Sequence, residues 1–312
     1  MTTSTTLRYE TCDVFTTVAF GGNPLAVVFG AEALAAETMQ KVAAEFNYSE
    51  TTFVLPPEDP SNTAHVRIFT PVAELPFAGH PNVGTAFVLA RQGEAFGQPI
   101  GGELAFEEQA GLVRISLLEG AHSSTANWPA GVVGAVLSTP QPFATHGTVP
   151  PEEAAACMGL TAADVVGEPV IASTGGPYVL AQLASAEALE RCRVVPAAFA
   201  ASEGMGRVGK VFGYLPPAAP EPSGELRVRC RMFTARGTED PATGAANCAM
   251  LGLLASKCAG AGTLRATIAQ GVEMGRPSEL LGEADFAGGR VTAVRIGGRC
   301  VPMMRGEVAL SR

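Results

Sequence analysis

Hydrophobic positions along the chain follow two periods, and each period predicts a different kind of element. Alternating or β-branched runs predict strands, which in the first part of the chain cover 12–20, 24–29, 51–55, 65–69 and 113–118. In the second part the same pattern covers 169–173, 177–183, 210–215 and 226–234. The segment 31–46 instead has apolar residues at helical spacing with polar residues opposite, which predicts a surface helix, and 150–160 and 185–192 follow the same rule.

Two further segments, 81–93 and 242–257, are small or apolar almost all round. A helix of this composition has to be buried on every face, and the simplest container is a curved sheet wrapped around it. We therefore predict an α+β fold of two pseudo-symmetric halves, each a barrel-like mixed or antiparallel sheet around a central buried helix. The alternative is a helix packed between two flat layers.

The two parts of the chain also resemble each other in sequence. "GGNPLAVV" (21–28) is similar to "TGGPYVLA" (174–181), "TTFVLPP" (51–57) to "VFGYLPP" (211–217), "RIFTP" (67–71) to "RMFTA" (231–235) and "PFAG" (76–79) to "PATG" (241–244). The offsets run 153, 160, 164 and 165 in the same order, which a duplication explains better than chance. We expect one half at 1–128, completed by a C-terminal strand at about 299–312, a second half at 129–298, and an active site in the cleft between them.

Composition and charge narrow the classes of function. The 312 residues are too many for one ordinary core, and 47% of them are hydrophobic, so they suffice for two folded halves. A net charge of −9 without a Lys/Arg cluster disfavours nucleic acid as a partner, and the apolar runs are too short to span a membrane. Seven cysteines without CxxC spacing, and no secretion signal, indicate reduced thiols in the cytoplasm. The four histidines show no ligand spacing, so no metal site is expected.

Both buried helices are preceded by a turn rich in Pro and Gly, "ELPFAGHPNVG" and "TEDPATGAAN". Backbone N–H groups at such helix starts, together with the helix dipole, form an anion site, and a small carboxylate is the natural ligand. The two turns carry His80 and Asp240, which we take to stand at matching places in the two halves. Each has a structural alternative: Asp240 before Pro241 also fits a helix N-cap, and His80 also fits a hydrogen-bonded core histidine.

Glu50 is a lone carboxylate at the joint between a helical and a strand-like run in "EFNYSETTFVLP" (45–56). Its counterpart in the second half, by the 160 offset, is Lys210. The halves are therefore chemically unequal at this point, which predicts one site per chain with Glu50 as its unpaired carboxylate. The alternative is an exposed loop charge.

Five ordered motifs resemble the phenazine-biosynthesis isomerase (PhzF-like) family. They are "FGGNPLAVV", "FNYSETTFV", "RIFTPVAELPFAGHPNVGTA", "TEDPATGAAN" and "QGVEMGRPS", and the likeness runs from about Val14 to Ser278. The resemblance implies the diaminopimelate epimerase-like fold, a homodimer, and an isomerase that needs neither a metal nor an organic cofactor. It implies that Glu50 is the general acid/base that moves a carbon-bound proton, because a carbon acid needs a base shielded from water.

The same resemblance extends to residues around the substrate. It implies that His80 and Asp240 flank a small anionic substrate at the helix starts as further catalytic groups. The substrate-binding positions it implies are Asn23, Ser49, Gly79, Thr243, Gly244 and Ala245. Ala245 is a departure, because the family turn often reads "DPATGSA" or "DPVTGSA" and so carries a hydroxyl there. This departure puts the family's best-known substrate, a dihydro-hydroxyanthranilate, in doubt.

Two other classes of function remain open. A racemase or epimerase of the same fold would use a cysteine at each helix-start turn, but these turns carry Gly79–His80 and Asp240–Pro241, and Cys248 lies about two turns further on. A different pair of groups could still epimerise a substrate. The third class is a small-molecule-binding protein without catalysis.

Overall fold

The computed structural model describes residues 5–120, 131–215 and 224–310, and the chain divides into two compact units. The first unit comprises Met1–Pro140 and Gly297–Arg312, and the second comprises Gln141–Ile296. The expected boundary at 128/129 lies outside the described residues. The strand that follows it, β10 (Gly131–Ser138), pairs with strands of the first unit, so this unit reaches Pro140.

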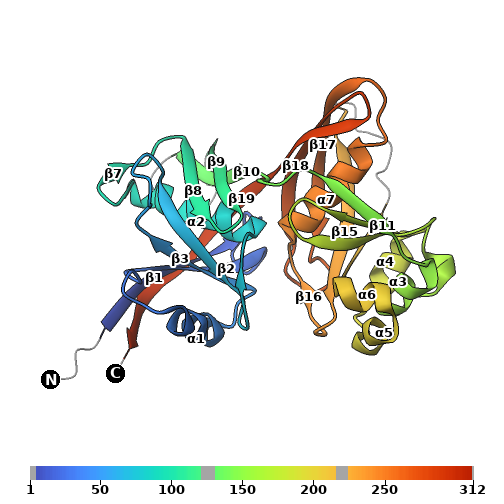
Figure 1. Cartoon of the computed structure of the whole chain (residues 1–312), viewed down its shortest axis with the longest axis horizontal. Helices are drawn as coiled ribbons and strands as arrows, with labels where there is room; N and C mark the ends of the chain where they lie inside the picture. The colour runs from blue at the N-terminus through green and yellow to red at the C-terminus, as the bar shows by residue number, and fades with distance from the viewer. Residues whose placement is uncertain (1–4, 121–130, 216–223, 311–312) are drawn as a thin grey trace. The chain divides into compact units, whose positions relative to one another are not determined.

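The first unit is a closed mixed barrel of eight strands (Figure 1). In their order around the barrel they are β1 (Thr5–Val14), β2 (Asn23–Phe29), β3 (Glu50–Leu55), β4 (Ala64–Phe69), β8 (Glu103–Glu108), β9 (Gly111–Gly120), β10 and the C-terminal part of β19 (Arg290–Leu310). The last strand closes the ring on the first, with Thr5 opposite Leu310. Short strands lie between them: β5 (Glu74–Leu75), β6 (Glu94–Ala95) and β7 (Gln98–Pro99).

The helix α2 (Gly79–Gln92) lies against five strands of this barrel, β1, β2, β3, β9 and β10. All of its residues from Gly79 to Leu89 are buried, which confirms the predicted central helix and contradicts the alternative of two flat layers. Gly84 lies where the helix is packed tightly against the barrel strands, since a Cβ at this position would lie 2.5 Å from the side chain of Leu25. The amphipathic helix α1 (Ala36–Phe46) contacts β3 and β4 and buries Met39, Val42 and Ala43.

The second unit repeats this plan with extra helices. Its strands are β11 (Ala144–Thr148), β12 (Val170–Ser173), β13 (Pro177–Gln182), β14 (Lys210–Tyr214), β15 (Leu226–Thr234), β16 (Glu239–Asp240), β17 (Ala261–Gln270), β18 (Ser278–Ala287) and the first part of β19. The central helix α7 (Gly244–Ala255) is buried at every position except Ala245 and Leu254, and it contacts β12, β13, β17 and β18. The added helices are α3 (Pro151–Cys157), η1 (Ala162–Asp164), α4 (Ala186–Arg191), α5 (Pro196–Ala201) and α6 (Glu203–Val208).

Strand pairing shows that the two units are copies of one topology. The pairs β2–β3 and β13–β14 are parallel, β3–β4 and β14–β15 are antiparallel, and β4–β8 and β15–β17 are again parallel. The register is kept as well, because Thr51 lies opposite Phe69 and Val211 lies opposite Phe233. These pairs stand at the offsets of 160 and 164 seen in the sequence, so the fold class of two pseudo-symmetric halves is confirmed.

The first strand differs from its predicted position. A strand was expected over 12–20, but β1 covers Thr5–Val14 and a turn follows it. The chain leaves the sheet here because Phe15 and Phe20 both adopt positive φ, of 66° and 68°, and the buried carboxylate of Asp13 accepts a hydrogen bond of 2.7 Å from the backbone N–H of Phe20.

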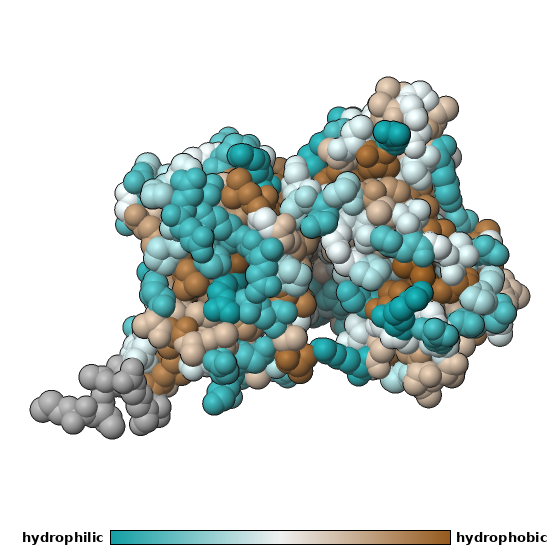
Figure 2. Space-filling view, viewed as in Figure 1, coloured by the Kyte–Doolittle hydropathy of each residue, from teal (hydrophilic) through white to brown (hydrophobic). Residues whose placement is uncertain are grey.

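On the face drawn in Figure 2, hydrophilic side chains cover much of the first unit and apolar side chains occur in small groups. Among the described helices, none is both long and apolar enough to span a membrane.

Candidate active site

Glu50 is the first residue of β3 and follows the turn that ends α1. The helix stops where the sequence predicted, because Asn47 takes the left-handed conformation of a C-cap, with φ 53°. The Glu50 side chain is only 17% exposed, and its Oε2 lies 3.1 Å from Nδ1 of His80. The alternative of an exposed loop charge is therefore wrong, since the carboxyl group is directed at the start of α2.

His80 is the second residue of α2, and its side chain is 4% exposed. Burial lowers the pKa of His80 to about 3, while the backbone carbonyl of Pro24 acts in the opposite direction. The ring is therefore neutral near pH 7, with one nitrogen as donor and the other as acceptor. Its Nδ1 is also 3.4 Å from Nδ2 of the buried Asn23, so this atom can donate to Glu50 or accept from the amide, according to the tautomer.

The first turn of α2 has no side-chain cap. The N-cap residue Ala78 has an extended backbone and offers no side-chain oxygen to the N–H groups of the turn. Gly79 is the first helical residue and is buried without a side chain that could block approach. Free N–H groups at a helix N-terminus attract negative charge. Ser49, which precedes Glu50, is half-buried.

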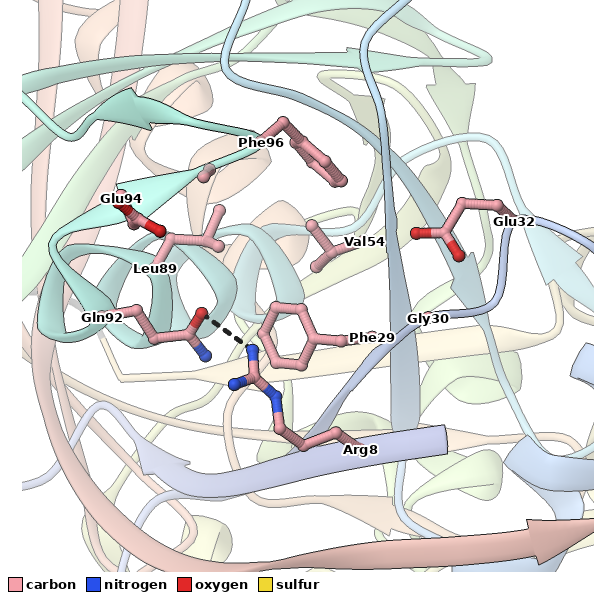
Figure 3. A pocket seen from close by; sticks show the side chains of 10 residues that line it. Arg8, Phe29, Gly30, Glu32, Val54, Leu89, Gln92, Glu94 and Phe96 are labelled. Atoms are coloured by element: carbon pink, nitrogen blue, oxygen red, sulfur yellow. Dashed lines mark hydrogen bonds between the residues drawn. The ribbon is translucent and has the colours of Figure 1, made fainter. Parts of the chain in front are cut away.

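The first unit also has a surface pocket of about 420 Å³ (Figure 3), and it contains none of the predicted site residues. Arg8 lies over the ring of Phe29 in this pocket, and its guanidinium donates a hydrogen bond of 3.3 Å to Gln92. The pocket is therefore a separate feature from the Glu50–His80 pair.

Asp240 is the last residue of β16, and the prediction that it matches His80 is wrong. It pairs with β15 at the place where Leu75 pairs with β4, so Leu75 is its counterpart in the first unit. Counting from the first residue of each central helix, the counterpart of His80 is Ala245. Asp240 is not the N-cap of α7 either, because that position belongs to Thr243, three residues later.

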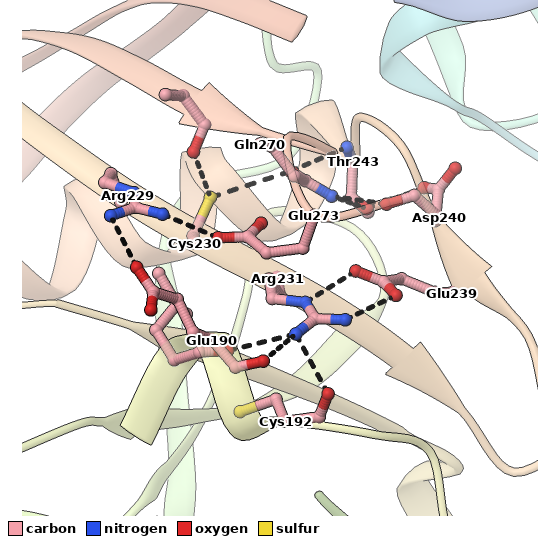
Figure 4. Close-up of polar contacts among 12 residues, drawn as sticks. Glu190, Cys192, Arg229, Cys230, Arg231, Glu239, Asp240, Thr243, Gln270 and Glu273 are labelled. Atoms are coloured by element: carbon pink, nitrogen blue, oxygen red, sulfur yellow. Dashed lines mark hydrogen bonds and ion pairs between the residues drawn. The ribbon is translucent and has the colours of Figure 1, made fainter. Parts of the chain in front are cut away.

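The side chain of Thr243 ties Asp240 to the start of α7 (Figure 4). Its hydroxyl donates a hydrogen bond of 2.6 Å to the Asp240 carboxylate and accepts one of 3.0 Å from Nε2 of Gln270. Gln270 also accepts from the backbone N–H of Thr243 at 3.1 Å and from Asn247 at 2.9 Å. The carboxylate of Asp240 is thus held in one position by groups that are themselves buried.

Gly244 and Ala245 form the first turn of α7, and Gly244 is buried while Ala245 is half-buried. Ala245 is therefore the one residue of this turn whose side chain reaches the surface of the unit. The side chain at this half-buried position brings no hydroxyl.

Gln270 and Asn247 were not predicted from the sequence, although the repeat contains a signal for one of them. Asn82 and Asn247 stand at the same place in the two central helices, and both donate to the carbonyl of the N-cap residue, at 2.9 and 3.0 Å. An amide at equivalent positions of a duplication indicates a shared structural task. Across residues 5–120, 131–215 and 224–310, no three His, Cys, Asp or Glu side chains are grouped so as to hold a metal ion.

Residues 12–306 of the chain match the family model of phenazine biosynthesis-like proteins, PhzC-PhzF. An uncharacterized isomerase of Mesorhizobium japonicum is 35% identical over 97% of this chain and 99% of its own length. The trans-2,3-dihydro-3-hydroxyanthranilate isomerase of Pseudomonas aeruginosa is 33% identical over 97% of this chain and 99% of its own length. These matches confirm the predicted family and the predicted enzyme class.

The fold is also that of a solved structure. The crystal structure of the Bacillus anthracis phenazine biosynthesis protein of the PhzF family superimposes with a TM-score of 0.81 at 23% sequence identity, covering 98% of this chain and 100% of that one. This likeness extends over both units and agrees with the predicted architecture.

Proposed function

Because the chain belongs to the phenazine biosynthesis-like family, we propose that it is a cofactor-independent isomerase that moves a carbon-bound proton on a small, cyclic carboxylate. The observation that supports this most is the Glu50 carboxyl group, 17% exposed and 3.1 Å from the neutral ring of His80. A carboxylate largely shielded from water, with a hydrogen-bonding partner that can serve as donor or acceptor, is suited to take a proton from carbon and return it.

In the proposed reaction, ionised Glu50 removes a proton from one carbon of the substrate, and the C–H electron pair moves into the adjacent π system. Protonated Glu50 then delivers the proton to a different carbon, so that substrate and product have the same atoms. His80 supports both states of the carboxyl group, since its Nδ1 can donate to the ionised form or accept from the protonated one.

The developing negative charge needs fixed donors, and we assign this task to the helix starts. Backbone N–H groups at Gly79 in α2 and at Gly244 and Ala245 in α7 are placed where a helix dipole favours an anion. Asp240, held by Thr243, is the second carboxyl group in the proposal and would contact the substrate opposite Glu50. Asn23 and Ser49 would complete the binding site, which requires that the two units share one cleft.

We expect Ala245 to restrict which substrates the chain accepts. The Pseudomonas aeruginosa relative is named for trans-2,3-dihydro-3-hydroxyanthranilate, which is the first compound to test. Ala245 cannot donate a side-chain hydrogen bond, so we expect the preferred substrate to lack the acceptor that a serine would bind. We also propose that the protein is cytoplasmic and forms a homodimer. Light scattering of the purified protein would test the dimer.

The test is exchange of substrate C–H for deuterium in D₂O, followed by NMR, with a panel of cyclic and amino-acid carboxylates. Glu50→Gln should lower the exchange rate by about 10²- to 10⁴-fold, the usual contribution of a general base. Glu45→Gln is the matched control, because Glu45 is an exposed carboxylate on α1, five residues away, and should leave the rate unchanged. Equal rates for the two variants would refute the role of Glu50, and exchange at the α-carbon with loss of chirality would identify an epimerase instead.

A further inference from the structure

Glu108, the last residue of β8, occupies the place in the first unit that Gln270 occupies in the second. In the first unit Ala64 pairs in parallel with Phe106, two residues before Glu108. In the second unit Val228 pairs with Ile268, two residues before Gln270. Since β4 and β15 correspond residue by residue, the two side chains are equivalent in the repeat.

Gln270 uses both ends of its amide to hold the start of α7. Its Oε1 accepts hydrogen bonds from the backbone N–H of Thr243 and from Nδ2 of Asn247, at 3.1 and 2.9 Å. Its Nε2 donates to the backbone carbonyl of Asp240 at 2.9 Å. The turn before the helix therefore needs one acceptor and one donor from this position.

Glu108 meets the same surroundings with a carboxyl group. Both of its oxygens are buried, and among the described residues neither has a partner within hydrogen-bond distance, although the Asn82 amide is close enough to favour the ionised form. Asn82, the counterpart of Asn247, points its Nδ2 at the carbonyl of Ala78, and its Oδ1 is likewise buried without a hydrogen bond among those residues. Burial raises the pKa of Glu108 to about 8, and the Asn82 side chain opposes this shift. A carboxylate could only accept here, whereas a protonated carboxyl group presents one donor and one acceptor, as an amide does.

Burial alone raises this pKa, because no neighbouring charge contributes to it and the Asn82 amide acts in the opposite direction. Arg67 of β4 is bound to Glu74 of β5, and Arg91 of α2 is bound to Glu10 of β1. The other titratable groups on the surrounding elements are His65 on β4, His80 on α2, Glu103 and Glu107 on β8, and Arg114 and Glu119 on β9.

We propose that Glu108 is a positioning residue for His80, acting as a neutral carboxylic acid that replaces the amide of Gln270. Its proton is donated to the turn before α2, at the carbonyl of Leu75, the residue that corresponds to Asp240. This fixes the first turn of α2 and with it the ring that faces Glu50. The catalytic meaning of this position rests on the proposed function, but the protonation and its effect on the fold do not.

The test compares Glu108→Gln with the wild-type protein and with Glu103→Gln, an exposed control on the same strand. A carboxyl group with a pKa of about 8 in the folded protein, and an ordinary value of 4.5, keeps its proton on folding while the unfolded chain loses it. The contribution of the Glu108 carboxyl group to the stability of the wild type is therefore lost as the pH rises from 4.5 to about 8. The melting temperature of Glu108→Gln should decline less over this range, and Glu103→Gln should follow the wild type.

A second measurement reports whether Glu108 positions the His80 ring. The NMR signals of the His80 ring should shift near pH 8 in the wild type, as Glu108 ionises, and stay constant in Glu108→Gln. The deuterium exchange of the wild type should fall over the same pH range, and Glu108→Gln should abolish that fall, whereas Glu108→Ala should lower exchange at every pH. Parallel melting curves for wild type and Glu108→Gln, or failure of this isosteric variant to fold, would overturn the proposal. Neither melting nor the His80 signals require a substrate, so this outcome is separate from failure of the proposed function.

Discussion

Arg231 in β15 holds together two parts of the second unit, and its replacement gives a quantitative test. Its Nε and Nη2 bind both oxygens of Glu239 in β16 at 2.7 and 2.8 Å, while Nη1 donates to the carbonyls of Leu189 and Cys192 at the end of α4, at 3.0 and 2.9 Å (Figure 4). The Arg231 side chain is only 7% exposed. Nη1 also donates to the carbonyl of Glu190 at 3.3 Å, so replacement by methionine keeps much of the volume but removes a donor from a half-buried carboxylate and from three carbonyls.

The expected loss of stability depends on how deeply the ion pair is buried, and the equivalent pair of the first unit serves as the control. Removing one partner of a buried ion pair costs about 3–5 kcal/mol, because the remaining charge is left without compensation. Arg67 and Glu74 form the equivalent pair in the first unit with the same two distances, 2.7 and 2.8 Å, but their side chains are 21% and 22% exposed. Arg67→Met should therefore cost only about 1 kcal/mol, near the upper end for solvent-exposed pairs.

Urea unfolding followed by circular dichroism measures both losses in one assay. We expect Arg231→Met to lower the free energy of unfolding of the second unit by about 3–5 kcal/mol, and Arg67→Met to lower that of the first by about 1 kcal/mol. Hydrogen exchange at the amides of α4 should rise in Arg231→Met alone. Equal losses in the two variants would refute the argument that burial, rather than pairing geometry, sets the contribution of these ion pairs.

Two further predictions concern single side chains. The ring of His80 should stay neutral from pH 5 to pH 9 and gain a proton only near its lowered pKa of about 3. The contribution of the neutral ring to the free energy of unfolding is therefore lost as the pH falls from 6.5 towards 3. An NMR titration midpoint between pH 5.5 and 7 would contradict this. Alkylation of the native protein should modify Cys258, which is half-buried, without loss of deuterium exchange, because burial shields and raises the pKa of the other thiols, Cys12, Cys157, Cys192, Cys230, Cys248 and Cys300. Inactivation that substrate prevents would instead support a cysteine racemase.

The architecture could be predicted from the sequence because the duplication and the two apolar helices are local patterns. A helix without a polar face requires a surrounding sheet, and the offsets of 160 and 164 are the ones that the strand register keeps. The first strand was misplaced because "TTLRYET" is polar, and its first residues, Thr5–Leu7, are paired only with β19, about 300 residues away in sequence. Such pairing leaves no local signal.

The part of the site that depends on local sequence signals could also be predicted. The position of Glu50 followed from a helix stop and a strand start that lie next to each other. The correspondence of Asp240 with His80 did not hold, because "DP" is a good N-cap signal in isolation while the chain makes a short strand pair there and starts its helix later. Glu108 gave no local signal, since its meaning comes from a comparison with Gln270 that requires the strand register.

The strand β19 has a consequence for how the protein is made. Residues up to Ile296 complete the second unit, whereas the barrel of the first unit closes only when Gly297–Leu310 pairs with β1 (Figure 1). During synthesis the ribosome releases residues 5–140 first, but their barrel lacks the strand that the C-terminal part of β19 supplies until nearly the whole chain has emerged. We therefore expect the second unit to fold first, and the nascent N-terminal segment to depend on chaperones that cover the exposed edge of β1.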